Sequence, residues 1–403
     1  MRIAVISDTH LGYAYTDDTE DDSFVQFGEA LDRAIAGGAD LILLPGDIFD
    51  SRTPKQETWA KALKLFQKPL LAKKNGTRVE RYVGKQKEIS PMAFQGVPVV
   101  AIHGTHERRG EHLVNPVELL EEAGYLIHLD KSGVVLEKNG ERVAIIGLSG
   151  VPERDVKNEL ALVPKPVEGA FNVFVFHQST KEEIYDADEA FISFDDLPKG
   201  FDLYIDGHIH WRKWLPEKRF LIAGSTVITQ QKEKEAQQGK GFFIVETSPL
   251  NASFVRLESQ RPFYFKKISF DSANQDKVSA EIASFLDTVP RTAKKPLVKI
   301  KLVGKMEVGR RSNQIDLSAF RETKDAIVSI DNELESDEFK KLVAELRSLH
   351  QSKKSVDEMG LDLIRRLLEQ TNYDGIRVDD IIDALADGDT DFVMKKVLEK
   401  AQQ

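Results

Sequence analysis

The chain has 403 residues, a formal net charge of −10, 41% hydrophobic and 30% charged residues, and no cysteine. This length predicts two or three domains, and the composition is that of a globular protein with a sizeable core. Without cysteine, disulfides, thiolate zinc sites and a cysteine nucleophile are excluded, so any metal must be held by His, Asp, Glu or Asn. The acidic balance disfavours nucleic-acid affinity over the whole surface but allows a local basic face.

No apolar run approaches the roughly 20 residues of a membrane-spanning helix, and residues 1–7 have the pattern of a first strand. We therefore expect a cytoplasmic protein with no membrane partner.

The first predicted strand, Arg2–Ser7, ends in Asp8 and His10. Positions two apart in an extended strand end point to the same face, so these two side chains are expected to converge. After a helix over residues 24–35, the strand Asp40–Leu44 leads to Gly46-Asp47 at what should be the same edge of the sheet.

Residues 51–88 carry eleven Lys or Arg against three Glu. Thr53 is expected to cap a helix whose first residue is Pro54, with lysines on its outer face. Residues 73–90 read as an irregular basic insertion. The excess of basic residues is typical of a surface that binds a nucleic-acid phosphate backbone, but it is equally typical of a helix face exposed to solvent.

The next predicted strand, Val97–Ile102, leads to Thr105-His106-Glu107. Asn115 is the expected N-cap of a helix that ends at Gly124, and Asn139-Gly140 predicts a hairpin turn. The apolar strand Phe171–Phe176 then leads to His177.

The strand Phe201–Ile205 leads to His208 and His210, two imidazoles two positions apart. Such a pair is a common metal-binding arrangement, although alone it is matched by ordinary surface histidines. Five of the nine histidines follow predicted strands in this way. Of the other four, His103 is expected to be structural, and the rest follow no pattern.

Three regions differ in character along the chain. Residues 1–260 hold all the strands that end in candidate chemistry, residues 261–332 have the strand-helix-strand pattern of a small α/β domain, and residues 333–403 are helical. The helical tail is too small to bury its apolar faces alone and is expected to dock on a partner.

The ordered series D-x-H, G-D, G-x-H-E, H and G-H-x-H resembles the calcineurin-like metallophosphoesterase superfamily. Within it, the opening M-R-I-A-V-I-S-D-T-H-L-G and the later G-D-I-F-D-S-R-T-P resemble the archaeal double-strand-break repair nucleases of the "meiotic recombination eleven" type. The resemblance covers about the first 330 residues in detail and the tail by position only.

This resemblance implies a four-layer α/β/β/α sandwich with a small capping domain that binds DNA and a helical tail that binds an ATPase. It also implies a prokaryotic DNA nuclease that binds two Mn²⁺ ions, or Fe²⁺ or Zn²⁺, and acts as a 3′–5′ double-strand exonuclease and single-strand endonuclease. In that scheme, a hydroxide held by the two ions attacks the phosphodiester. The implied partners are double-strand ends and single strands of DNA, an SMC-like coiled-coil repair ATPase, and a second copy of the chain.

The family pattern assigns one metal to Asp8, His10 and His210 and the other to His177 and His208, with Asp47 as the bridge. His106 matches the histidine that acts on the leaving group, and Glu107 is a candidate to orient it. Four arginines near these motifs are candidates for DNA contacts: Arg52, Arg108, Arg109 and Arg212.

Two positions depart from the family pattern. Thr105 replaces an asparagine ligand of the second metal, and a hydroxyl is a poorer neutral ligand than an amide oxygen. Asp50 stands where the family often has a histidine that contacts DNA, so no DNA contact is assigned to it.

Two other functions fit the same motifs. The chain could be a phosphodiesterase for small nucleotides or phosphoproteins, since a metal site does not name its substrate. It could also be a DNA-end-binding scaffold in which Thr105 weakens catalysis.

Overall fold

The computed structural model describes residues 1–84, 88–110, 112–183, 192–321 and 323–335. The helical tail expected over residues 333–403 therefore lies almost wholly outside the described residues. Within them, no helix is both long and apolar enough to cross a membrane.

The chain divides into two compact units. The first comprises Met1–Lys267, Ile282–Lys301 and Ser318–Asp331, and the second comprises Ile268–Glu281, Leu302–Leu317 and Asn332–Gln403. Both large sheets and every candidate site residue belong to the first unit.

Six strands form the first sheet: β1 (Arg2–Val5), β2 (Leu41–Pro45), β4 (Val99–Ile102), β5 (Ile127–His128), β12 (Gly241–Thr247) and β13 (Leu250–Arg256). Their order is β13-β12-β1-β2-β4-β5. Strands β1, β2 and β4 are parallel neighbours, so their carboxyl ends lie at one edge of the sheet.

Seven strands form the second sheet: β3 (Arg78–Val83), β6 (Ser132–Lys138), β7 (Glu141–Leu148), β8 (Phe171–Phe176), β9 (Leu203–Asp206), β10 (Lys213–Leu215) and β11 (Phe220–Ile222). Their order is β10-β11-β9-β8-β7-β6-β3, and β8 is parallel to β9. The expected hairpin joins β6 to β7, with Asn139 at φ 52° and Gly140 at φ 87°. Positive φ at both central residues is what a type I′ turn requires.

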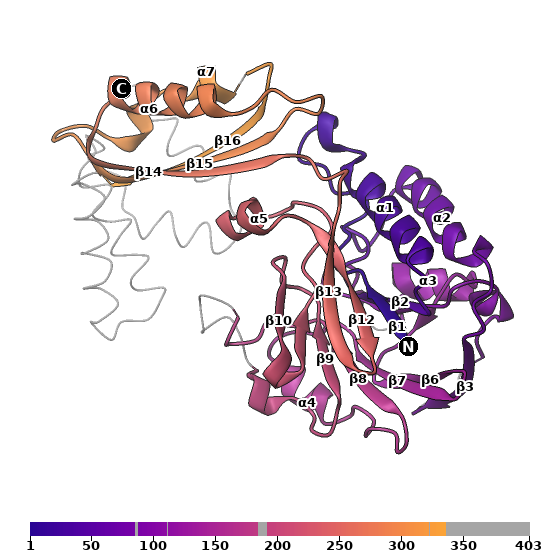
Figure 1. Ribbon diagram of the computed structural model, residues 1–403. Helices are drawn as coiled ribbons and strands as arrows, with labels where there is room; N and C mark the ends of the chain where they lie inside the picture. Colours follow the sequence, from indigo (N-terminus) through magenta and orange to yellow (C-terminus); the bar gives the residue numbers. More distant parts are fainter. Residues whose placement is uncertain (85–87, 111, 184–191, 322, 336–403) are drawn as a thin grey trace, which may run out of the picture. The chain divides into compact units, whose positions relative to one another are not determined.

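Among the five helices described within residues 1–260, the first three pack on the outer face of the first sheet and the fourth on the outer face of the second (Figure 1). They are α1 (Asp22–Ala36), α2 (Gln56–Leu71), α3 (Pro116–Glu122), α4 (Val156–Leu160) and α5 (Glu233–Gln238). The short 3-10 turns η1 (Asp17–Thr19), η2 (Pro91–Phe94), η3 (Phe194–Asp196) and η4 (Pro216–Lys218) complete this part of the chain.

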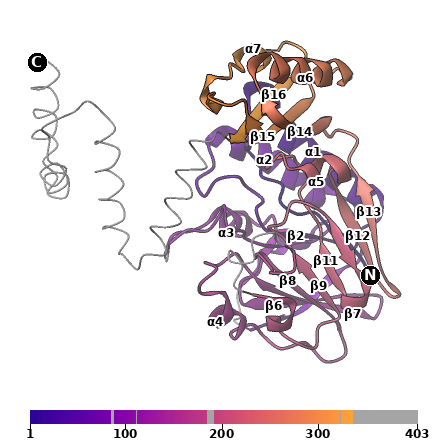
Figure 2. The same cartoon turned by 90° about the vertical axis from the view of Figure 1, so that its left-hand side faces the viewer.

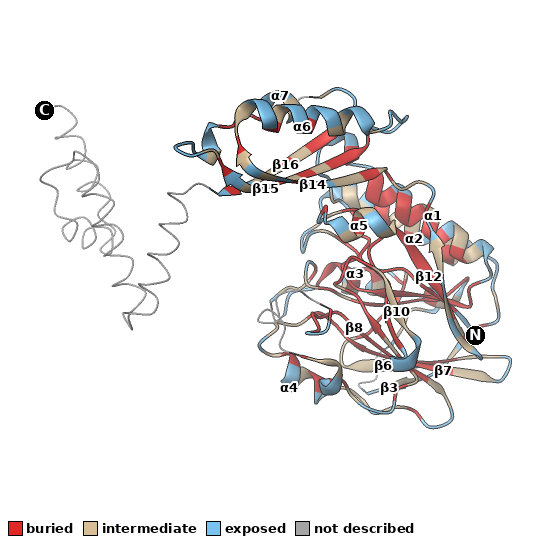
Figure 3. Ribbon diagram, turned by 60° about the vertical axis from the view of Figure 1, so that its left-hand side comes forward, coloured by how far each residue is buried: buried red, intermediate tan, exposed pale blue. Residues whose placement is uncertain are grey.

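Alternation along the strands divides the core into layers. In β1, Ala4 packs with α1, α2 and α3, whereas Ile3 and Val5 pack against the facing sheet with residues such as Val143 and Val173. The outer face of the second sheet buries Phe174 and Phe176 with Val156 of α4. Both faces of the central strands are buried (Figure 3), which explains why the sequences of these strands are continuous apolar runs. The expected α/β/β/α sandwich is confirmed.

A third sheet has the order β14-β15-β16, formed by β14 (Phe263–Ala273), β15 (Leu297–Met306) and β16 (Ile327–Glu335). The helices α6 (Gln275–Thr288) and α7 (Ser318–Arg321) and the turn η5 (Ser312–Gln314) lie between these strands in sequence. Figure 2 shows these elements from a second direction. The strand-helix-strand pattern expected after residue 261 is present, while the domain boundaries remain predictions.

Two local expectations are wrong. Helix α2 begins at Gln56 with Lys55 as its N-cap, because the Ser51 hydroxyl accepts the Thr53 N–H at 3.2 Å in a preceding turn. The stretch read as an irregular insertion contains the edge strand β3, in which Arg78 pairs with Glu137 across the strands at 2.5 Å.

Candidate metal centre

Five loops that follow strands carry the candidate residues. Asp8 and His10 follow β1, Asp47 follows β2, and His106 follows β4, all in the first sheet. His177 follows β8 and the His208–His210 segment follows β9, both in the second sheet. The parallel strands of the two facing sheets thus bring these loops to a common place.

The backbone of this centre is not extended, contrary to the expectation for Asp8 and His10. Both have left-handed φ values, 49° and 42°, as do Asp47 at 46° and His208 at 66°. Each such residue costs of order 1–3 kcal/mol, and clusters of them are typical of functional sites. The side chains therefore converge through strained loops that begin where the strands end.

Close backbone approach also requires glycine here. A Cβ on Gly104 would lie 2.2 Å from Asp47 Oδ1, and a Cβ on Gly207 would lie 2.1 Å from the Pro45 oxygen. Both contacts are far shorter than real Cβ contacts, so any other residue at either position would force the loops apart.

Among the residues that the structure describes, three groups of three His, Asp or Glu side chains have possible ligand atoms within 4.8 Å of one another. They are Asp8-His10-His210, His10-Asp47-His106 and Asp47-His177-His208. His10 and Asp47 each belong to two groups, so the three groups form one continuous centre.

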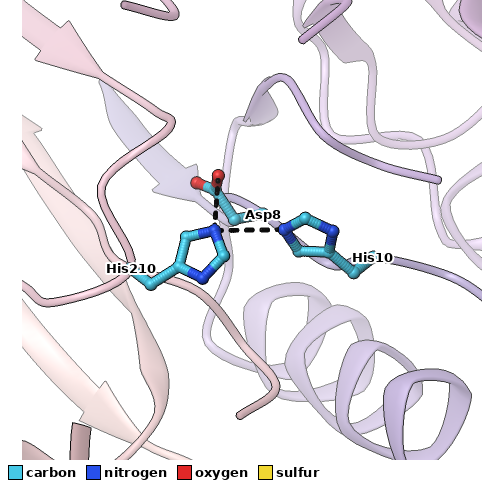
Figure 4. Close-up of side chains that lie close together, drawn as sticks. All are labelled: Asp8, His10 and His210. Carbon is cyan, nitrogen blue, oxygen red and sulfur yellow. Dashed lines mark hydrogen bonds and ion pairs between the residues drawn. The ribbon is translucent and has the colours of Figure 1, made fainter. Parts of the chain in front are cut away.

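The first group shows why a cation fits (Figure 4). His10 Nε2 and His210 Nε2 lie 3.2 Å apart, and His210 Nε2 lies 3.7 Å from Asp8 Oδ1. Asp8 Oδ1 is buried without any hydrogen-bond partner, and the buried His177 Nε2 faces the Asp47 carboxylate at 3.1 Å. A buried polar atom without a partner is costly, and a divalent ion between Asp8, His10 and His210 would satisfy Asp8 Oδ1. Carboxylate and imidazole without thiolate suit Mn²⁺, Fe²⁺ or Zn²⁺.

The outer nitrogen of each of three imidazoles is fixed by a neighbour. His177 Nδ1 lies 2.8 Å from the Pro45 oxygen, His10 Nδ1 lies 3.0 Å from Asp50 Oδ1, and His210 Nδ1 lies 2.6 Å from the Thr229 hydroxyl. In each ring this leaves Nε2 as the atom that faces the centre, as in histidine–metal sites with an oriented tautomer.

Asp47 lies in the middle of the centre. One of its carboxylate oxygens, Oδ1, accepts the His106 N–H at 2.9 Å, and the other, Oδ2, lies 3.1 Å from His177 Nε2. The Thr105 hydroxyl lies 3.4 Å from the same Oδ2. Thr105 is thus beside the centre, as its position in the motif predicts.

His106 is the exposed member, with 45% of its side chain accessible. Its ring meets that of His10 edge to face at 4.8 Å, and its Nδ1 lies 3.1 Å from the Asp50 carbonyl oxygen. Glu107 is fully buried, and its two oxygens accept the N–H groups of Phe49 and Gly104, each at 2.8 Å. Glu107 therefore ties the Asp47 loop to the His106 loop.

Charge is shared unevenly among these side chains. Burial lowers the pKa of His177, but the Asp47 carboxylate outweighs it and raises this pKa to about 10. Burial and the His177 charge lower the pKa of His208 to about 4. Burial opposes ionisation of Asp47, yet His177 pulls the pKa of that carboxyl well below its usual range. The pKa shifts of His177 and Asp47 have the same cause, the attraction between the His177 imidazole and the Asp47 carboxylate 3.1 Å away.

The four arginines predicted to contact DNA have different environments. Arg52 is exposed, whereas Arg108 and Arg109 are half-buried, with Arg109 donating to the Val114 oxygen at 3.1 Å. Arg212 donates to the Gln238 and Gly239 oxygens and stacks over Phe254 at 3.9 Å. Their contacts with DNA remain predictions.

Three residues that hold the imidazoles have no role predicted from the sequence. Asp50 departs from the family pattern, and its position three residues after Asp47 is a usable signal. Thr229 and the Pro45 carbonyl carried no signal, because they reach the histidines only through the folded structure.

Comparison with known proteins agrees with these observations. The sequence profile of the calcineurin-like phosphoesterase family matches residues 1–212. The "Double-strand break repair protein MRE11" of Homo sapiens is 28% identical over 330 residues, covering 71% of this chain and 46% of that protein. The chain thus spans about half the length of its mammalian relatives.

Two archaeal relatives match over more of their length. The "DNA double-strand break repair protein Mre11" of Sulfolobus acidocaldarius is 28% identical over 358 residues, which is 83% of this chain and 85% of that protein. The protein of the same name from Thermoplasma acidophilum is 26% identical over 330 residues, covering 78% and 79% of the two chains.

Proposed function

Because the chain belongs to the calcineurin-like phosphoesterase family, we propose that it is a Mn²⁺-dependent DNA nuclease that processes double-strand breaks. The proposed activities are 3′–5′ exonuclease on duplex ends and endonuclease on single strands. The relatives named for double-strand break repair support this substrate, since one of them aligns with 83% of the chain.

The observation that carries the proposal is the continuity of the three ligand groups through His10 and Asp47. Asp8, His10 and His210 would hold one ion, His177 and His208 would hold the other, and Asp47 would contact both. When bound, two divalent ions supply charge neutralisation at the phosphoryl oxygens and a nucleophile from water. Thr105, beside Asp47, would leave a place for water at the second ion.

His106 has the position of a proton donor in this scheme. The Asp50 carbonyl oxygen accepts its Nδ1–H, which leaves Nε2 as the atom that passes a proton to the leaving 3′ oxygen. The Asp50 carboxylate, 3.6 Å from Nδ1, balances the charge that the ring carries when Nε2 is protonated. Glu107, which accepts the Phe49 and Gly104 N–H groups, holds the His106 loop against the Asp47 loop.

The proposed partners are DNA, a second copy of the chain and a coiled-coil repair ATPase. For the second copy, Leu119 of α3 is 47% exposed, and Val114, two residues before α3 begins, is 55% exposed. The proposed ATPase contact lies in the tail beyond residue 335.

The decisive experiment measures Mn²⁺-dependent cleavage of an end-labelled duplex, a circular single strand and the chromogenic substrate bis(p-nitrophenyl) phosphate. Cleavage of both DNAs, absent in Asp47→Ala, is expected. Cleavage of the chromogenic substrate alone would favour a small-phosphodiester enzyme, and tight duplex-end binding without cleavage would favour a scaffold. Either result would overturn the nuclease proposal.

A further inference from the structure

A lysine without a role in the proposed chemistry is buried beside the metal centre. Lys240 is 2% exposed, and its ammonium group has three acceptors: Glu235 Oε1 at 2.5 Å, Ser225 Oγ at 2.6 Å and the His210 carbonyl oxygen at 2.9 Å. An ammonium group has three N–H donors, so every donor is used.

The three acceptors belong to three separate segments. Glu235 is in α5, Ser225 follows β11, and His210 is in the loop after β9. Glu235 is 1% exposed, and its other oxygen accepts the Lys232 N–H at 3.2 Å. Lys240 therefore joins α5 to the loop that carries a candidate metal ligand.

The backbone at His210 is confined on its other side as well. The Ser225 N–H donates to the same His210 carbonyl oxygen at 3.3 Å. A Cβ on Gly224 would lie 3.3 Å from that oxygen and 3.1 Å from the Trp211 carbonyl carbon. The peptide that follows the His210 imidazole is thus held between Gly224, Ser225 and Lys240.

Stability alone does not account for this arrangement. Desolvation of two charges offsets most of their attraction, and replacing a buried pair by apolar residues of similar volume is often neutral or stabilising. The pair instead fixes the positions of the groups around it, because an ammonium group that uses all three donors tolerates little displacement of its acceptors.

We infer that Lys240, paired with Glu235, is a positioning residue that fixes the His210 backbone and so places the His210 imidazole for one of the two metals. The inference rests on the metal site proposed above. Lys240 acts through His210 and touches neither metal nor substrate, so metal affinity is the quantity that it controls.

The test measures Mn²⁺ stoichiometry and dissociation constants by titration, together with the melting temperature of the metal-free protein. Lys240→Met alone would leave Glu235 buried without its partner, so the main variant is Lys240→Met/Glu235→Met. It is expected to melt near the wild type and to bind one of the two ions about 10-fold or more weakly, the usual effect of losing a group that orients a ligand.

Arg261 and Asp22 supply a matched control. They form another buried pair, 2.5 Å apart and 6% and 9% exposed, and the other hydrogen bonds of Arg261 go to the Asp18 and Lys295 carbonyl oxygens. Arg261→Met/Asp22→Leu is expected to keep both Mn²⁺ affinities. If the Lys240 double variant does not fold, Lys240→Arg replaces it as the test. Arginine keeps a positive charge beside Glu235 but cannot keep all three contacts of the ammonium group. The same loss of Mn²⁺ affinity is expected for this variant.

Wild-type affinity for both ions in a folded Lys240 variant, or an equal loss in the control, would overturn the inference. A wild-type protein that binds no Mn²⁺ would instead refute the proposed function, so the two failures are distinguishable.

Discussion

Asp47 is the single residue on which the proposed dinuclear centre depends most. It belongs to two of the three ligand groups, and both of its oxygens are engaged at the centre. Asp47→Ala should therefore remove both metals and abolish cleavage of DNA, with folding retained. Metal analysis and circular dichroism check this, and wild-type turnover in Mn²⁺ would contradict the bridging role.

His106 tests whether catalysis can be separated from metal binding. His106 belongs to the His10-Asp47-His106 group, and it is the exposed residue of the three. If it protonates the leaving group, His106→Ser lowers turnover by about 10²-fold while metal content and DNA affinity stay near the wild type. Loss of a metal from this variant would make His106 a ligand instead.

His177 gives the centre a pH dependence whose sign follows from its charge. Burial lowers its pKa, the Asp47 carboxylate raises it, and the outcome is a pKa of about 10 in the metal-free protein. Only the neutral imidazole binds a metal, so each ion taken up there releases a proton. Mn²⁺ affinity measured from pH 6.5 to 8.5 should rise about tenfold per pH unit. A Mn²⁺ affinity that stays constant over this pH range would contradict the prediction.

The sequence predicts which residues form the site better than it predicts their backbone conformation and contacts. The motif order named the residues of all three ligand groups, because each follows a strand whose apolar pattern is clear in the sequence. The left-handed backbone at Asp8 and His208 was missed, since an i, i+2 pattern was read as extended chain. The contacts of Asp50, Thr229 and Lys240 arise between loops far apart in sequence, where no local pattern operates.

At the scale of elements, helix starts were predicted well only where a complete cap exists. Asn115 accepts the N–H groups of Val117 and Glu118, and the Glu118 carboxylate accepts the Asn115 N–H, as the motif requires. Thr53 and Gln56 have the residue types of the same capping box, but the Thr53 N–H bonds to the Ser51 hydroxyl and the helix begins only at Gln56. The edge strand β3 was missed because its charged residues pair across strands, as Arg142 does with Glu80 at 2.6 Å.

Helix α3 carries the prediction for the dimer. Leu119 is 47% exposed, whereas its neighbour Leu120 is fully buried in the core against the first sheet. If α3 contributes to a two-fold contact, Leu119→Asp should give a folded monomer by light scattering.

Leu120→Asp is the matched control for that experiment. It buries a charge and should lower the free energy of unfolding by about 3 kcal/mol or more, so the protein loses its fold as well as its assembly. A wild-type protein that is monomeric at high micromolar concentration would contradict the dimer.

At the scale of the whole molecule, the candidate chemistry is confined to one part of the chain. All the candidate ligands lie between Asp8 and His210, and the family profile matches the same region. The residues after Glu335 contain only one histidine, His350, and repeated apolar positions such as Leu342, Leu346 and Leu363. Such a tail has the composition of a docking segment and no candidate for catalysis.

Truncation after Glu335 should therefore separate assembly from chemistry. The shortened protein is expected to keep Mn²⁺-dependent cleavage of single-stranded DNA, because every candidate ligand remains, and to lose co-purification with the cognate coiled-coil ATPase. A pull-down with tagged ATPase measures this, with Leu119→Asp in the full chain as a control that removes the dimer contact alone. ATPase binding that survives truncation would move the main docking surface into residues 1–335, and the third sheet, β14-β15-β16, would be the next region to test.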